Sequence, residues 1–265
     1  MATYLDRILA AHRAAAARDR RDLGDLRARA AASGPGRGFR AALSAQTEIA
    51  VIAEIKRASP SKGPLAPDLD PATLARAYQE GGATALSVLT DVEFFGGSPQ
   101  DLRAARAATA LPVLRKDFTV GPADVLDARC MGADAILLIA AALSPEEMVQ
   151  LMTLAASVGL DALIEVHDEA EAERALAAGA TVIGVNQRDL FTFEVDPARA
   201  VRLATRLPAD VVRVAESGIR TGEDVRHLAA AGFDAVLVGE ALVTSADPGA
   251  ALRELRRGAG VRAGR

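Results

Sequence analysis

The sequence contains little cysteine, histidine or aromatic residue, and it has no long apolar run. Its one cysteine, Cys130, cannot form an internal disulfide, and we expect a cytoplasmic protein kept in a reducing compartment. No stretch reaches the ~18 consecutive apolar residues of a membrane helix, and the N-terminus lacks a basic-then-apolar signal pattern. The net charge of −4 argues against nucleic-acid binding through a broadly basic surface. We therefore expect neither a membrane nor a nucleic acid as partner.

The three histidines do not have the spacing of metal ligands, so we predict no metal site. His12 and His227 fall in predicted helices, where surface or packing roles are expected. His167 follows Glu165, and we expect it to point away from Glu165 and to hydrogen-bond within its own loop.

After residue 48, eight short apolar runs alternate with stretches typical of helices. Many of these stretches open with a capping residue or a glycine followed by proline, which indicates a helix start. Eight such alternations predict a (β/α)8 barrel. An open doubly wound sheet is the alternative, but no G-x-G-x-x-G follows the first strand. The predicted strands are 51–55, 85–89, 112–114, 135–139, 162–166, 182–185, 211–215 and 235–238.

Residues 4–32 carry an amphipathic, Ala-rich pattern that predicts a helical extension, and the glycines and proline of 33–38 break it. We therefore divide the chain into an N-terminal helical extension packing on the barrel (1–48), the catalytic barrel (49–258) and a C-terminal tail (259–265).

Charged residues stand at the carboxyl ends of the predicted strands, where barrel proteins carry their active sites. Residues i and i+2 of a strand point to the same face, so Glu54 and Lys56 share a face. The same parity directs Lys116 and Glu165 toward the barrel axis. Exposure alone would explain one polar strand end, but four inward-facing charges favour an acid–base site.

The last two strands end in Ser217-Gly218 and Gly239-Glu240. Small residues at these positions let backbone N–H groups approach an anion, and a phosphate usually binds a barrel here. A plain tight turn is the alternative. The Glu240 carboxylate would repel a phosphate unless its side chain turns away.

These strand ends resemble the indole-3-glycerol phosphate synthase family over the whole chain. The motifs that carry the resemblance are EIKRASPSKG (54–63), LTD (89–91), FFGGS (94–98), LRKDF (114–118), LIEVH (163–167), NQRDL (186–190), ESGI (216–219) and LVGEAL (237–242). The chain differs from the family pattern at Gln187, where asparagine is common, and at Ala215, where serine is common.

The resemblance implies a carboxy-lyase of tryptophan biosynthesis that uses no metal and no organic cofactor. Its small phosphorylated substrate would be 1-(2-carboxyphenylamino)-1-deoxyribulose 5-phosphate. Ring closure with loss of CO2 and water would give indole-3-glycerol phosphate. We expect a monomer or a weak homodimer.

The proposed chemistry needs acids and a base, and the strand-end residues supply them. Lys116 suits the acid that protonates the ketone oxygen during ring closure. Glu165 and Lys56 are candidates for the base and the second acid, and the sequence does not divide the two steps between them. Glu54 would hold Lys56 or Lys116 in place.

The remaining predicted site residues bind or orient the substrate. Asn186 would supply neutral hydrogen bonds, and Arg188 and Ser217 would hold polar groups of the substrate or the mouth itself. Ser59, with Lys56, would bind the anthranilate carboxylate. The predicted walls of the aryl pocket are Phe95, Phe118 and Leu137 or Leu138, and the predicted phosphate ligands are the backbone N–H groups of Gly218, Gly239 and Glu240.

Two other functions fit a barrel of this kind. One is an isomerase acting on a neighbouring aminoribulose phosphate, which would be expected to carry a cysteine or an aspartate in its first strand instead of Glu54 and Lys56. The other is a catalytically silent barrel that binds a phosphorylated metabolite or serves as an assembly partner, against which the presence of Lys116 and Glu165 argues.

Overall fold

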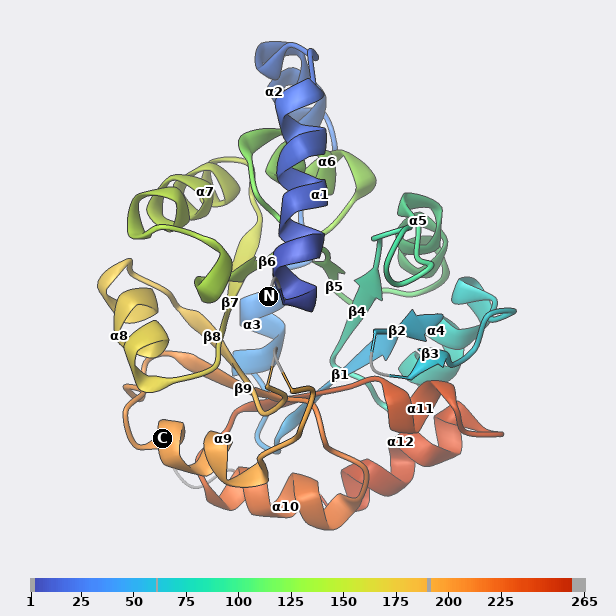
Figure 1. Ribbon diagram of the computed structural model, residues 1–265. Coiled ribbons are helices and arrows are strands. Elements are labelled where there is room, and N and C mark those ends of the chain that lie inside the picture. The colour runs from blue at the N-terminus through green and yellow to red at the C-terminus, as the bar shows by residue number, and fades with distance from the viewer. Residues whose placement is uncertain (1–2, 61, 190–191, 259–265) are drawn as a thin grey trace.

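The structure, a computed structural model, describes residues 3–60, 62–189 and 192–258. Eight parallel strands close into a barrel in the order β1-β10-β9-β8-β7-β6-β5-β4, and helices surround them (Figure 1). This confirms the predicted (β/α)8 barrel and excludes the open sheet. The strands are β1 (Ala50–Ile55), β4 (Ala85–Leu89), β5 (Val113–Lys116), β6 (Ala135–Ile139), β7 (Asp161–Val166), β8 (Val182–Asn186), β9 (Val212–Glu216) and β10 (Ala235–Val238).

The predicted pairs of a capping residue and a proline each begin a helix with proline in its first turn. These helices are α4 (Pro71–Gly81), α5 (Pro99–Ala108), α6 (Pro122–Met131), α7 (Pro145–Ser157), α9 (Pro197–Ala204) and α12 (Pro248–Arg257). The other elements after the barrel strands are η1 (Ala140–Ala142), α8 (Glu169–Ala177), α10 (Gly222–Ala230) and α11 (Glu240–Val243).

Alternate strand residues pack into two separate apolar layers. Val51 and Ile55 belong to the layer between the strands and the helices, whereas Ile52 and Leu114 belong to the barrel interior. Glu54 therefore points inward, as its strand parity predicts.

Three helices precede the barrel: α1 (Tyr4–Arg18), α2 (Leu23–Ala31) and α3 (Phe39–Ser44). The helical extension was predicted, but it breaks between α1 and α2, and α3 was missed. Phe39 and Leu43 of α3 are fully buried in the barrel-interior layer. The Arg40 N–H donates to Asp161, the first residue of β7, so α3 closes the amino-terminal end of the barrel.

Helix α1 lies at the opposite, carboxyl end of the strands. Its His12 bonds to Asp91 just after β4, and its Arg13 donates to the Ala142 carbonyl after β6. The predicted tail 259–265 lies outside the described residues. The loop after β1 holds a two-stranded antiparallel hairpin, β2 (Ala58–Ser59) and β3 (Gly63–Pro64). Among the described residues, no helix is long and apolar enough to span a bilayer.

Candidate active site

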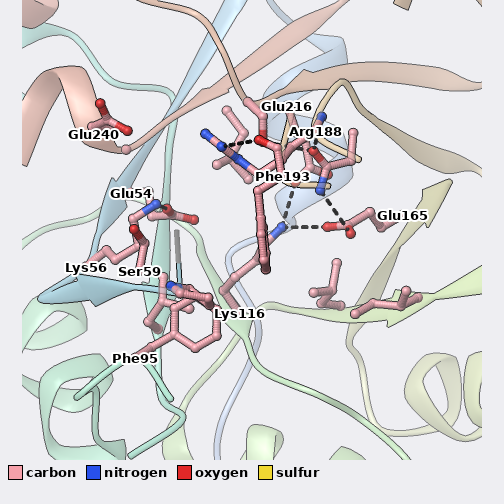
Figure 2. A pocket seen from close by; sticks show the side chains of 18 of the residues that line it. Glu54, Lys56, Ser59, Phe95, Lys116, Glu165, Arg188, Phe193, Glu216 and Glu240 are labelled. Atoms are coloured by element: carbon pink, nitrogen blue, oxygen red, sulfur yellow. Dashed lines mark hydrogen bonds and ion pairs between the residues drawn. The ribbon is translucent and has the colours of Figure 1, made fainter. Parts of the chain in front are cut away.

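A pocket opens at the carboxyl ends of the barrel strands (Figure 2). All fourteen predicted site residues line it, although they come from all eight barrel strands or the loops that follow them. They are Glu54, Lys56, Ser59, Phe95, Lys116, Phe118, Leu137, Glu165, Asn186, Arg188, Ser217, Gly218, Gly239 and Glu240. The roles assigned to them remain predictions.

Lys116 lies at the inner end of this pocket between two glutamates (Figure 2). Its Nζ is 2.9 Å from Glu165 Oε2 and 2.6 Å from Glu216 Oε2. Asn186 Nδ2 donates to the other Glu165 oxygen at 3.2 Å. One ammonium group therefore bridges two buried carboxylates.

The surroundings give these three groups different proton affinities. Burial alone would favour neutral Lys116, but the charges of Glu165 and Glu216 outweigh it and raise the Lys116 pKa. Burial also opposes ionisation of Glu165, yet Lys116 and His167 hold its pKa well below the usual range. Burial raises the pKa of Glu216 to about 7 despite its contact with Lys116. The site thus combines a charged acid, an ionised carboxylate and a carboxyl that titrates near neutrality.

A second lysine–glutamate pair forms another wall. Lys56 Nζ is 2.7 Å from Glu54 Oε1, and Ser87 Oγ donates to the other Glu54 oxygen at 3.3 Å. Of the two partners predicted for Glu54, the structure pairs it with Lys56.

Two glycines leave room for the inward-pointing glutamates. A Cβ at Gly239 would lie 2.5 Å from Glu54 Oε1, and a Cβ at Gly184 would overlap the Glu216 carboxylate. The absence of a side chain at these positions lets both glutamates reach the barrel axis.

The turn after β9 holds Ser217 in the left-handed region, with φ of 68°. This conformation is uncommon for a residue with a side chain and is found at functional sites. Ser217 Oγ donates to Asn186 Oδ1 at 2.8 Å, and Gln187 Nε2 donates to the Ser217 carbonyl at 2.7 Å. Gln187, one of the two departures from the family pattern, therefore holds the turn through this hydrogen bond. Ala215, the other departure, is buried in the layer between strands and helices.

The apolar side of the pocket contains the predicted aryl walls. The rings of Phe95 and Phe118 lie 6.1 Å apart between centroids. Leu137 packs inside the barrel, whereas Leu138 faces the helices, so Leu137 is the wall residue. Close to this side, Ser59 Oγ is buried and has no hydrogen-bond partner among the described residues.

At the opposite end, the Glu240 side chain is turned toward two basic residues. Lys62 Nζ lies 2.6 Å from Glu240 Oε1, and Arg220 Nη2 lies 3.6 Å from it. These contacts partly neutralise the carboxylate beside the predicted phosphate position. Arg188, which was expected to hold polar groups of the substrate or the mouth itself, donates to the Phe193 carbonyl at 2.9 Å within its own loop.

The expectation that His167 points away from Glu165 is wrong. Positions 165 and 167 share strand parity, and His167 Nε2 lies 3.4 Å from Glu165 Oε1. The predicted local bond also exists, because Nδ1 lies 3.1 Å from Glu171 Oε2. The centroid of the His12 ring lies 5.3 Å from that of the Phe118 ring, and His227 is exposed on α10.

Sequence reasoning missed several residues of the site. Glu216 was left out although its parity with the inward Val212 and Val214 places it there. Tyr4 and Ile8 of α1 also line the pocket, and no local pattern indicates that α1 covers it.

Lysine usage is a sequence signal that was available. The chain has three lysines against 28 arginines, and Lys56, Lys62 and Lys116 all stand at this mouth. Arginine cannot release its proton at ordinary pH, whereas lysine can. The scarce residue is thus placed where proton transfer is proposed.

The fold brings together three possible metal ligands that lie far apart in the sequence. Atoms of His12, Asp91 and Asp117 lie within 4.8 Å of one another. His12 bonds to Asp91 at 2.8 Å, and Arg115 lies 2.8 Å from Asp117. These contacts account for the cluster as a hydrogen-bonded ion network.

Comparison with known proteins identifies the family. The family model described as indole-3-glycerol phosphate synthase matches residues 5–255. The chain belongs to this family. A relative named indole-3-glycerol phosphate synthase from Mycobacterium ulcerans is 53% identical over 256 residues, which are 96% of this chain and 94% of the relative. Indole-3-glycerol phosphate synthase 2 from Streptomyces coelicolor is 55% identical over 226 residues, 85% of this chain and 87% of the relative.

Solved structures outside the indole-3-glycerol phosphate synthase family share the barrel. Thiamine phosphate pyrophosphorylase from Pyrococcus furiosus aligns with a TM-score of 0.60 and 19% identity, covering 79% of this chain and 94% of that chain. 3-Hexulose-6-phosphate synthase from Salmonella typhimurium aligns with a TM-score of 0.61 and 14% identity, covering 79% of this chain and 98% of that chain. At these identities the likeness concerns the fold alone.

Proposed function

We propose that the pocket converts 1-(2-carboxyphenylamino)-1-deoxyribulose 5-phosphate to indole-3-glycerol phosphate, CO2 and water. Family membership names the reaction, and the contact of Lys116 with Glu165 and Glu216 is the observation that carries the assignment of residues. A silent barrel would have no use for a buried lysine between two carboxylates, whose burial costs free energy.

The first step joins the carboxylate-bearing ring carbon to the ketone carbon. The C=O electron pair becomes an alkoxide, which Lys116 protonates from the inner end of the pocket. The ring carbon then loses CO2, and the electrons of that bond restore the aromatic ring. Glu165 and Glu216 hold the Lys116 ammonium in position and keep it charged before the reaction.

Dehydration completes the indole ring. The new hydroxyl leaves with a proton from an acid, while the neighbouring CH2 carbon gives a proton to a base. Glu165, the ionised carboxylate, is our candidate for the base, and Lys56 on the Glu54 wall is our candidate for the acid. The reverse assignment has Lys56 as the base and Glu165 as the acid. Separate variants of Lys56 and of Glu165 distinguish the two assignments.

The two ends of the substrate fit opposite ends of the pocket. The Ser59 hydroxyl, which has no hydrogen-bond partner in the described part of the chain, and Lys56 suit the carboxylate, beside the apolar walls Phe95 and Phe118. The phosphate would lie on the backbone N–H groups of Gly218, Gly239 and Glu240, close to Lys62.

The test is to add the carboxyphenylamino-deoxyribulose phosphate and to follow indole absorbance and fluorescence. The chain has no tryptophan, so the background emission is low. Substrate that stays unchanged with the purified wild type would refute the function.

The role of Lys116 is tested with two variants. We expect Lys116→Ala to abolish turnover and to keep the fold. Lys116→Arg keeps the positive charge but cannot release a proton, so it should also be inactive. Turnover by folded Lys116→Ala at the wild-type rate would overturn the mechanism, whereas turnover restored only by Lys116→Arg would show that charge, not proton donation, is needed.

A further inference from the structure

We propose that His167, held by Glu171, is a positioning residue that keeps the Glu165 carboxylate oriented and ionised during the reaction. This inference rests on the proposed function. It concerns two side chains, His167 and Glu171, that line no part of the pocket.

The His167 ring is fixed between two carboxylates by the start of α8. Its Nδ1 lies 3.1 Å from Glu171 Oε2, and its own backbone N–H donates to the same oxygen at 2.8 Å. Glu171 stands in the first turn of α8, where the Asp168 cap anchors its backbone. The ring therefore cannot turn away without losing its contact with Glu171.

The other ring nitrogen faces the catalytic carboxylate. His167 Nε2 lies 3.4 Å from Glu165 Oε1 and is buried without an aligned hydrogen-bond partner among the described residues. At this distance the contact is electrostatic, and a small movement of Glu165 would turn it into a hydrogen bond.

Two carboxylates on one imidazole select its charged form. A neutral ring has one N–H, so its second nitrogen would present a lone pair to a carboxylate, whereas the imidazolium donates from both sides. The charges that act on the ring are those of Glu165 and Glu171. Burial opposes protonation, but the contacts with Glu165 and Glu171 outweigh it and raise the His167 pKa to about 9.

The reaction explains why Glu165 needs a second cation. In this structure Lys116 binds Glu165 Oε2, but it must turn to the substrate to donate its proton. A buried carboxylate that loses its only cation takes up a proton and stops being a base. His167 stands on the opposite oxygen, Oε1, and remains there when Lys116 moves.

Glu216 offers an internal comparison. It shares Lys116 with Glu165, but its Oε1 has no hydrogen-bond partner among the described residues. Of the two carboxylates, the one with the histidine is the one that stays ionised near neutral pH.

The test is a double-mutant cycle in steady-state kinetics. We expect His167→Gln to lower kcat between roughly 10-fold and 100-fold, less than the loss of an acid–base group itself, with KM unchanged. Glu171→Gln should lower kcat in the same way, because it acts through His167. In the double variant, Glu171→Gln should add no further loss. His227→Gln, on the exposed face of α10, is the control and should keep the wild-type kcat.

A wild-type kcat in His167→Gln, or additive losses in the double variant, would overturn the inference. A wild type that does not convert the substrate would refute the proposed function instead. A readout without turnover separates the two: the imidazole ¹⁵N shifts of wild-type His167 should report protons on both nitrogens near neutral pH. A neutral ring under those conditions would also overturn the inference.

Discussion

Glu165 and Glu216 share one lysine, yet their other neighbours drive their pKa values in opposite directions. Glu165 has Asn186 and His167 on its second oxygen, whereas the second oxygen of Glu216 faces Gly184. Charge and hydrogen bonds favour the ionised form of the first, and burial favours the protonated form of the second. Such a split between neighbouring carboxyls allows one to act as a base while the other holds a proton.

The raised pKa of Glu216 predicts a pH-dependent cost to stability. Between its ordinary value of 4.5 and about 7, folded Glu216 keeps a proton that the unfolded chain has released. The folded state then binds more protons, so the free energy of unfolding falls as pH rises through this window. Because glutamine does not titrate, the stability of Glu216→Gln relative to wild type should increase over the window, by at most about 3 kcal/mol.

Denaturant unfolding of both proteins below pH ~4.5 and above pH ~7 measures this difference. A constant difference across the window would show that Glu216 titrates in the folded protein as it does in the unfolded chain.

Gly184 is the residue that admits Glu216 to the barrel axis. In Gly184→Ala the added methyl would overlap the carboxylate and push it from Lys116, so we expect kcat to fall at least ~10-fold, the effect of about 1.4 kcal/mol on the barrier. Gly121→Ala is the matched control, because its methyl would come no closer than 4.0 Å to a neighbouring atom. Wild-type kcat in Gly184→Ala would mean that the position of Glu216 does not matter for turnover.

Strand parity predicts the inward direction of the site residues, including Glu216 and His167, whose inward direction was not assigned from the sequence. Lys116 and Glu165 obey the two-residue period of their strands, and Glu216 obeys it too but was not counted. His167 lies one residue beyond β7, where the Glu171 contact keeps it on the inward side. The pairing of particular charges, such as Lys116 with two glutamates, depends on distances across the barrel that no single strand encodes.

At the scale of elements, α1 covers the mouth and is attached to it through its side chains. Ile8 is buried, Tyr4 meets Phe94 and Phe193 edge to face, and His12 bonds to Asp91. Asp91 also accepts from the N–H groups of the loop that carries Phe95. The His12 bond therefore links α1 to one wall of the pocket.

This bond predicts a pH-dependent docking of α1. Burial disfavours charged His12, but the hydrogen bond with Asp91 and the charges of Asp117, Asp91 and Asp124 together outweigh it and raise the His12 pKa above its ordinary 6.5. The contribution of the bond is therefore complete below pH 6.5 and is lost as pH rises through the raised value. In hydrogen exchange, the protection factors of α1 amides should fall over that range in wild type and should be low and flat in His12→Ala.

Helix α2 serves as the internal reference for this measurement. It packs through Leu26 and Ala30 on Leu126 of α6, a cluster that does not include His12. Its protection should be the same in both proteins. Loss of α2 protection in His12→Ala, or an unchanged pH dependence of α1, would contradict a docking role for His12.

At the scale of the whole molecule, the barrel was predictable because its signals are local and repeated. Proline after a cap marked helix starts such as Pro71 and Pro145, and each buried strand was a short apolar run. Helix α3 was missed because its six residues are too few for a period, and its burial comes from the strands that surround Phe39. The cover provided by α1 was missed for the same reason: it depends on tertiary contacts.

The two ends of the barrel divide stability from function, and two phenylalanines test this division. Phe39 is fully buried at the amino-terminal end, whereas Phe95 is half-buried and lines the pocket at the other end. We expect Phe39→Ala to lower the free energy of unfolding by about 3–5 kcal/mol, because it leaves a cavity in the barrel interior. The folded fraction should keep the wild-type kcat and KM, since no residue of α3 lines the pocket at the mouth.

Phe95→Ala should show the reverse pattern. Removing one aryl wall should raise KM roughly tenfold, the equivalent of about 1.4 kcal/mol of lost contact, with a smaller loss of stability than Phe39→Ala. Denaturant unfolding gives the free energy of unfolding of each variant, and steady-state kinetics give its kcat and KM. If Phe39→Ala changed kcat in the folded enzyme as much as Phe95→Ala changes KM, the closed end would be coupled to the catalytic end through the strands, and the barrel would not separate its two tasks.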